Sequence, residues 1–111
     1  MKSIRNPSRK PTHPGAILRE DVMPELGITQ ASFASYLGVS RLTVSEILNE
    51  KRGISPEMAM RISAVIGGSP EMWLRMQEAL DLWMVAQKFK KNPKTVPRPL
   101  KQMLLAPNAL S

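Results

Sequence analysis

Residues 30–49 read QASFASYLGVSRLTVSEILN, and this segment predicts two short helices joined by a tight turn. Phe33 and Leu37 recur at helical spacing, so they would give the first helix one buried side. Gly38 follows directly, at a point where a short turn needs the positive φ that glycine adopts easily. Ser40 then stands where a hydroxyl can cap the next helix by accepting a backbone N–H. The segment is therefore typical of a helix-turn-helix.

The second helix of this motif has one apolar side and one polar side. Val44, Ile47 and Leu48 share the inward face. The rest of its surface carries hydroxyl, guanidinium, carboxylate and amide groups, which can read base edges in the major groove of DNA. A corner of a plain helical bundle is the alternative, but the agreement of glycine, cap and inward aliphatic residues favours DNA binding. The residues expected at the DNA are Thr29, Gln30, Ser40, Arg41, Thr43, Ser45, Glu46, Asn49, Lys51 and Arg52.

Members of this set are expected to make different contacts. Arg41 falls in the first turn of the second helix, where a guanidinium can reach O6 and N7 of guanine. Lys51 and Arg52 follow that helix, so phosphates are their expected targets. Thr29 and Gln30 begin the first helix, where free backbone amides and the helix dipole favour a phosphate.

The net charge of +7 is concentrated at the two ends of the 111-residue chain. Residues 1–10 contain four basic and no acidic side chains, and residues 88–111 contain six basic and no acidic side chains. Residues 11–87 contain six basic and nine acidic side chains, so the centre is mildly acidic. Each basic end is either an arm that contacts the DNA backbone or a solvated end without a specific role, and the composition favours neither.

The sequence lacks the residues that most catalytic and metal sites need. It has no cysteine, which excludes disulfides and thiolate metal sites, and a single histidine, His13. His13 precedes Pro14 and Gly15 at the start of an expected helix that Pro24 should end, so a structural role is favoured over catalysis or metal binding. We therefore expect no enzyme activity, no catalytic residue, no metal and no cofactor. A small hydrolase or nuclease would need paired carboxylates or a nucleophile in an apolar setting.

The sequence also bears on location. No apolar run approaches the roughly 20 residues that span a bilayer, and no hydrophobic signal segment opens the chain. The default expectation is a cytoplasmic protein without a membrane partner.

Two further helix starts lie in the second half of the chain. Ser-Pro-Glu occurs at residues 55–57 and again at residues 69–71, and each combines a cap, a first-turn proline and an acid at the positive helix end. The first of these helices should stop at two glycines, and its expected buried residues are Met58, Ile62, Val65 and Ile66.

The last helix should run to about Lys88, and it has more apolar side chains than one small domain covers on one side. We expect a second copy of the chain to bury part of this surface, especially Leu80, Trp83 and Met84. The alternative is that all of it closes the core of the monomer. The expected organisation is a flexible basic arm at residues 1–12, a domain at residues 13–88 and a basic, proline-containing tail at residues 89–111.

Several motifs together resemble the HigA-type antitoxins, which belong to the lambda-repressor-like (Xre) helix-turn-helix proteins. The resemblance covers about residues 11–87. It is carried by residues 11–15 (PTHPG), 17–20 (ILRE), 38–41 (GVSR), 52–59 (RGISPEMA), 69–74 (SPEMWL) and 81–83 (DLW). Glu46 departs from the family, since some relatives carry a basic or small residue at this DNA-facing position. Glutamate can accept from cytosine N4, but it also repels phosphate.

The resemblance implies an all-α, lambda-repressor-like fold of five helices. The longer C-terminal dimerisation helix and the flexible basic tails are expected from the apolar and charge patterns above, and the tail from about residue 88 is longer and more basic than the resemblance implies. The resemblance also implies a homodimer that binds double-stranded operator DNA, represses its own operon and silences a RelE-like (HigB-type) toxin, a ribosome-dependent mRNA endonuclease. A stand-alone Xre-type repressor without a toxin partner is the alternative. The two differ in whether a neighbouring reading frame encodes a small basic RelE-like protein.

Overall fold

A computed structural model of the chain describes residues 9–101, and every regular element in that range is helical. The elements are α1 (Pro14–Ile17), the π-helical turn η1 (Leu18–Val22), α2 (Met23–Leu26), α3 (Gln30–Leu37), α4 (Arg41–Leu48), α5 (Pro56–Ile66), α6 (Pro70–Lys91) and the 3-10 turn η2 (Pro93–Thr95). Since α1, η1 and α2 follow one another without a break, five helices form the described fold, which confirms the predicted class. Most of the expected N-terminal arm and the end of the tail lie outside the described residues.

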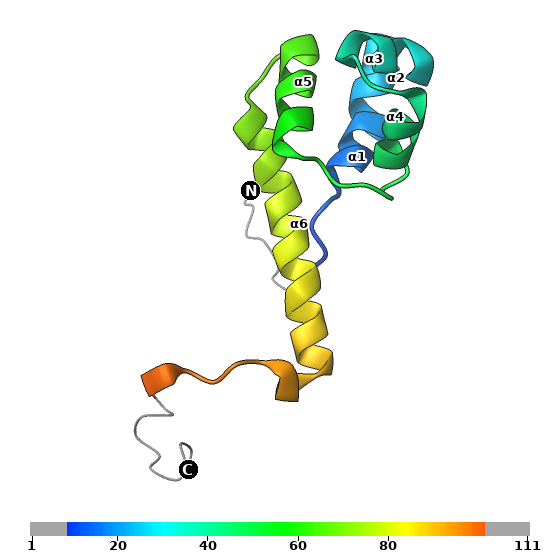
Figure 1. Cartoon of the computed structure of the whole chain (residues 1–111). Helices are drawn as coiled ribbons and strands as arrows, with labels where there is room; N and C mark the ends of the chain where they lie inside the picture. The colour runs from blue at the N-terminus through cyan, green and yellow to red at the C-terminus, as the bar shows by residue number, and fades with distance from the viewer. Residues whose placement is uncertain (1–8, 102–111) are drawn as a thin grey trace, which may run out of the picture.

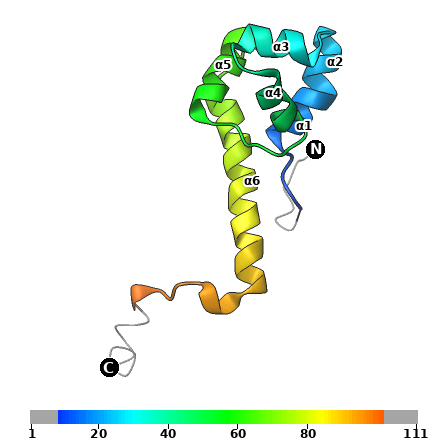
Figure 2. The same ribbon diagram turned by 45° about the vertical axis from the view of Figure 1, so that its right-hand side comes forward.

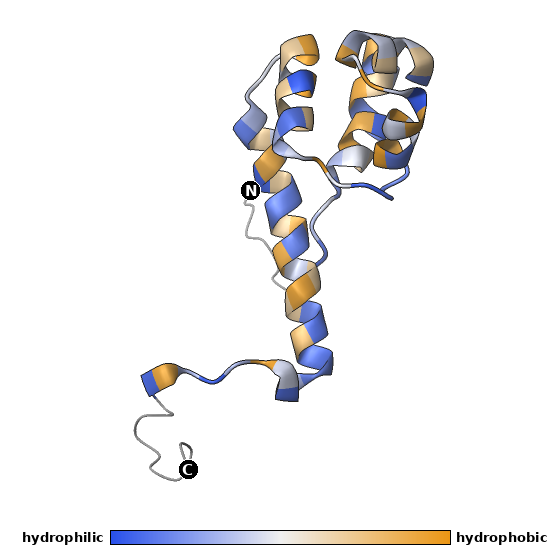
Figure 3. Ribbon diagram, in the orientation of Figure 1, coloured by the Kyte–Doolittle hydropathy of each residue, from blue (hydrophilic) through white to orange (hydrophobic). Residues whose placement is uncertain are grey.

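Helices α1 to α5 form a bundle from which α6 projects. In both views α6 starts beside α5 and continues well past the bundle (Figures 1 and 2). Apolar residues nevertheless recur along its projecting half, as the hydropathy colouring shows (Figure 3). Among them are Leu82, Met84, Val85 and Phe89, all of them exposed.

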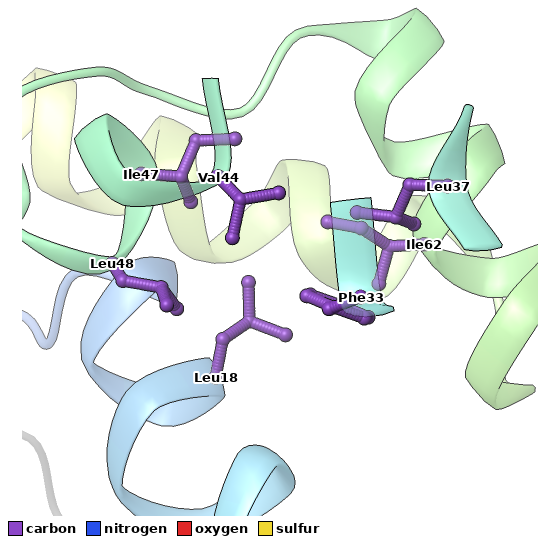
Figure 4. Close-up of a pocket in the computed structure, with 7 residues that line it drawn as sticks. All are labelled: Leu18, Phe33, Leu37, Val44, Ile47, Leu48 and Ile62. Atoms are coloured by element: carbon purple, nitrogen blue, oxygen red, sulfur yellow. The ribbon is translucent and has the colours of Figure 1, made fainter. Parts of the chain in front are cut away.

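The core of the bundle joins the motif helices to their neighbours. Side chains from η1, α3, α4 and α5 point toward one another around a small apolar void (Figure 4). They are Leu18, Phe33, Leu37, Val44, Ile47, Leu48 and Ile62, each buried. Trp73, near the start of α6, is 2% exposed and belongs to the same cluster, so it fixes the long helix to the bundle.

His13 caps the first helix, which is the structural role that the sequence predicts. Its Nδ1 accepts a hydrogen bond from the backbone N–H of Gly15 at 2.8 Å. The side chain is buried, and this burial lowers the pKa of His13 below its ordinary value of 6.5, although the nearby Glu50 carboxylate opposes the shift. The imidazole therefore remains a neutral acceptor in the folded chain.

The prediction that Pro24 ends the first helix is wrong. The helical path continues through α2 to Leu26 and ends at Gly27, which adopts a left-handed φ of 66°. The π-helical turn η1 lies immediately before α2, and Met23 N donates to Leu18 O in the wider pattern. A wider turn relieves the clash between a proline ring and the preceding turn, so Pro24 is accommodated near the start of α2.

Two other boundaries also differ from expectation. Val65 is expected inside but is exposed, in the last turn of α5. Met58 and Ile62 are buried as predicted, Ile66 packs against the core, and Ala59 is an additional buried residue of that helix. The last helix runs to Lys91, three residues past the expected Lys88, because the first residue that cannot continue it is Pro93.

The buried His13 predicts a pH-dependent stability. Because the pKa of His13 is lowered on folding, the unfolded chain binds more protons near pH 6, and the free energy of unfolding should fall as pH drops below about 6.5. His13→Asn keeps an acceptor at the cap position but does not titrate, so its stability should fall less between about pH 7 and pH 5. Denaturant unfolding of both proteins across this range measures the difference. Equal slopes would show that His13 is not responsible.

Candidate nucleic-acid interface

Both helices of the motif begin at a side-chain cap. The Thr29 hydroxyl accepts from Ser32 N at 3.1 Å, and the Ser40 hydroxyl accepts from Thr43 N at 3.1 Å. Between the helices, Gly38 has a left-handed φ of 75°, as the sequence predicts. The turn closes where Val39 N donates to Ala34 O at 3.0 Å. The motif therefore has two well-defined helix starts and little freedom in its turn.

At the C-terminal end of each motif helix, an arginine from another element donates a hydrogen bond to the last carbonyl. Arg61 of α5 donates to the carbonyl of Leu37 at 2.9 Å, and Arg19 of η1 donates to the carbonyl of Leu48 at 2.6 Å. The last carbonyls of a helix lack internal partners and carry partial negative charge, so a guanidinium satisfies both needs. Arg19 also pairs with Glu20 and Glu50, and these partners raise its pKa. No local pattern in the sequence indicates either arginine, because each acts on a carbonyl far away in the chain.

Helices α1 and α4 approach each other closely at Gly15 of α1. A Cβ at this position would overlap the backbone carbonyl of Ile47, near the end of α4. Glycine is therefore required here by the space between two helices, and the contact sets how far α4 lies from α1. Together with Arg19, it fixes the last turn of α4 against the first helix.

The outward side of α4 carries the predicted DNA-facing residues and one that the sequence reasoning missed. Arg41 is exposed in the first turn, and Glu46 is partly exposed on the side away from Val44. Leu42 is 66% exposed, although it is a large aliphatic side chain. It precedes Glu46 by four residues, so both lie on one stripe opposite the buried face. A helical projection could have found Leu42, but only polar residues were considered for this face.

Some predicted contact residues bond to one another in the free chain. The hydroxyls of Ser40 and Thr43 lie 2.9 Å apart and share a hydrogen bond. Asn49 Nδ2 donates to the carbonyl of Ser45 at 2.9 Å and approaches its hydroxyl at 3.3 Å. The Asn49 amide therefore caps the end of α4 rather than pointing freely outward.

The basic turn after α4 contains two exposed cations, Lys51 and Arg52, and Arg52 pairs with an acidic side chain. Glu50 adopts a left-handed φ of 61°, and Lys51 N donates to the carbonyl of Glu46 at 2.8 Å, so the chain reverses tightly. Lys51 is exposed. Arg52 bonds to the carboxylate of Glu46 at 2.6 Å, a pairing that the sequence reasoning did not anticipate.

Three further features concern metal, membrane and ligand sites. Among residues 9–101, no group of three or more histidine or acidic side chains is placed to hold a metal ion. Over the same residues, no helix is both long and apolar enough to cross a bilayer. A hollow on the projecting part of α6 is lined by Trp83, Met84, Gln87, Lys88 and Lys91.

Several proteins are similar to this chain in sequence, in fold or in both. A helix-turn-helix family profile matches residues 18–73. Antitoxin HigA-1 of Vibrio cholerae is 34% identical over 93 residues, which are 84% of this chain and 88% of the relative. The antitoxin GraA, solved in complex with its operator, is 39% identical, with a TM-score of 0.73 over 87% of this chain and 98% of GraA. The Pseudomonas aeruginosa antitoxin HigA, solved with the higBA promoter, is 35% identical, with a TM-score of 0.74 over 82% of this chain and 99% of that one.

The matched profile covers the whole of the motif described above, and the similarity to these proteins extends beyond it into α6. The chain therefore belongs to the helix-turn-helix family and, within it, to the HigA-type antitoxins, a group of DNA-binding regulators rather than of enzymes.

Proposed function

We propose that this chain is an antitoxin that binds operator DNA as a homodimer, represses its own operon and neutralises a RelE-like toxin. The observation that carries the DNA half is the outward side of α4, where Arg41, Leu42 and Glu46 are presented by a helix fixed at both ends. Relatives that are 35–39% identical were solved with an operator or promoter. The proposal places the protein in the cytoplasm and assigns it no catalytic activity.

In this proposal α4 enters the major groove and its flanks hold the backbone. Arg41, in the first turn, is suited to a guanine, and Leu42 beside it is suited to the methyl group of a thymine. Thr29 and Gln30 at the start of α3 and the exposed Lys51 after α4 are suited to phosphates. Ser40, Thr43, Ser45 and Asn49 would contribute hydroxyl and amide contacts once their mutual hydrogen bonds open.

The dimer half of the proposal rests on α6. Leu80 is 3% exposed in the single chain, so of the three residues expected at the interface it offers least to a partner. Trp83 is partly exposed and Met84 is 50% exposed, and both line the hollow on the projecting half of the helix.

Charge along α6 favours an antiparallel pairing of two copies. Asp81 and Lys88 are seven residues apart, so they share one face of the helix on either side of Met84. Two-fold symmetry in an antiparallel arrangement would set Asp81 of each copy near Lys88 of the other. The same symmetry would present two copies of α4 to two half-sites of one operator.

The toxin half of the proposal comes from the family. Relatives of this chain are named antitoxins, and the mildly acidic centre of the chain suits a basic partner. A stand-alone repressor of the same fold remains the second candidate, favoured by the relatives described only as helix-turn-helix regulators, one of them 40% identical over 76 residues.

Arg41 and Lys51 should differ in what they contribute to DNA binding. Arg41→Ala should lower affinity for the operator by about 1–3 kcal/mol and relax preference at one base pair, with little effect on random duplex. Lys51→Ala should weaken both duplexes alike and lower the log–log salt slope by about one unit. Salt titrations of both duplexes, with Arg75→Ala on α6 as the control, measure these effects. An unchanged specificity ratio in Arg41→Ala would contradict the assignment.

The dimer should depend on charge at Asp81 and Lys88. Asp81→Lys and Lys88→Asp should each weaken association, because each sets like charges together, and the double variant should restore it. Sedimentation equilibrium at micromolar concentrations measures association, and thermal unfolding checks that each variant is folded. A wild-type chain that is monomeric at tens of micromolar would contradict the dimer, and failure of the double variant to recover would contradict the antiparallel pairing.

The antitoxin role should appear in growth. Expression of the reading frame beside this gene should arrest growth, and co-expression of this chain should relieve the arrest. The Arg41→Ala variant is the informative control, because it should still relieve toxicity while repressing the operon poorly. Toxicity that persists with abundant, folded wild-type chain would favour the stand-alone repressor.

A further inference from the structure

The Glu46 carboxylate and the Arg52 guanidinium form a two-point contact beside the outward face of α4. Arg52 Nε and Nη2 both donate to Glu46 Oε1, at 3.0 and 2.6 Å. The backbone between the two residues is held as well, since Lys51 N donates to the carbonyl of Glu46 and Glu50 adopts a left-handed conformation. The tight turn therefore places the Arg52 guanidinium against α4, beside Glu46.

This pair contributes little to stability. The side chains of Arg52 and Glu46 are 51% and 34% exposed, and ion pairs exposed to this degree are typically worth about 0–1 kcal/mol. Its effect should be larger at DNA. A bare carboxylate on a helix in the major groove is repelled by phosphates on both sides, whereas a carboxylate paired with a guanidinium is close to neutral.

The geometry leaves part of the carboxylate available. Both donors of Arg52 approach Oε1, so Oε2 keeps its capacity to accept a hydrogen bond. Glu46 shares its stripe with the exposed Leu42, opposite the buried face of α4. A carboxylate accepts but does not donate. The major-groove donors are the amino groups of cytosine and adenine, and cytosine N4 is the usual partner of a glutamate.

We propose that Glu46 is a specificity-determining residue that accepts from cytosine N4, and that Arg52 is a positioning residue that orients and neutralises this carboxylate. Arg52 is thereby removed from the phosphate contacts that its place after the helix suggests. The inference rests on the proposed operator binding. It adds one base that the chain selects, and it explains through the contact with Arg52 how a glutamate is tolerated at this position. The competing arrangement has Arg52 leave Glu46 on binding and contact a phosphate.

A mutant cycle separates the two arrangements. The probe is a duplex selected by the full wild-type chain from a randomised library, compared with random duplex and with versions of the selected duplex altered at each base pair. The variants are Glu46→Ala, Arg52→Ala and the double variant, with Lys51→Ala as the matched control for a cation that contacts phosphate. Circular dichroism and thermal unfolding establish that each variant is folded.

If Arg52 acts through Glu46, Arg52→Ala should lower affinity for the selected duplex about tenfold and alter preference at the same base pair as Glu46→Ala. In the Glu46→Ala background, Arg52→Ala should change affinity by less than about twofold, because no carboxylate remains to position. The salt slope should not fall by a unit, whereas Lys51→Ala should lower it by about one. Arg52→Lys, which restores the charge but not the two-point contact, should recover affinity more than base preference.

Two results would overturn this inference. One is an Arg52→Ala variant that weakens selected and random duplexes equally, with a salt slope reduced by about one in both backgrounds. The other is a Glu46→Ala variant with unchanged preference at every base pair. A wild-type chain that selects no duplex from the library would instead overturn the proposed operator binding itself, so the two failures are distinguishable.

Discussion

The position of α4, the second helix of the helix-turn-helix motif, depends on the close backbone approach between α1 and α4. Gly15 lies so near the carbonyl of Ile47 that any side chain at that position would push the helices apart. Arg19, one turn further along the first helical stretch, then donates to the carbonyl of Leu48. These two contacts act on the last turn of α4, while Ser40 fixes its first turn. The backbone of α4 is therefore held in one position, and the contact of Arg52 with Glu46 acts in addition on an outward side chain.

The C-terminal end of α3, the other helix of the motif, is held by an arginine in the same way. Arg61 reaches from α5 to the carbonyl of Leu37, just before the glycine turn. Short helices of eight residues are marginal alone, so their ends need partners from elsewhere in the fold. The apolar core, to which η1, α2, α3, α4, α5 and α6 all contribute, supplies most of the burial, and the two arginines satisfy carbonyls that apolar side chains cannot. The side chains that hold the fold and the exposed side chains proposed to contact DNA thus lie on different faces of α4.

The parts of this structure that follow from local chemistry could be predicted from the sequence. Serine caps, first-turn prolines and the glycine turn act within a few residues, so the helix starts at Ser40, Ser55 and Ser69 were predicted correctly. Pro24 was misjudged because a π-helical turn accommodates it, and no sequence pattern indicates such a turn.

The candidate site shows the same division. The caps and the exposure of Arg41 follow from helical position. The contacts of Arg19 and Arg61 join residues 29 and 24 positions apart, and they depend on how the helices pack. The pairing of Arg52 with Glu46 depends on the left-handed Glu50 between them, which is a rare conformation for a glutamate. The exposure of Leu42 is also local, since its position four residues before Glu46 places it opposite the buried face of α4.

The contact at Gly15 sets the placement of α4, and one variant tests this dependence directly. Gly15→Ala should lower the free energy of unfolding by at least about 2 kcal/mol, because rigid backbone would have to move, and it should reduce operator affinity in the fraction that remains folded. Gly27→Ala, in open space with a left-handed φ, should cost only about 1–2 kcal/mol and leave affinity unchanged. Denaturant unfolding and operator titration of both variants give the comparison. A Gly15→Ala chain with the stability and the affinity of the wild type would contradict the account.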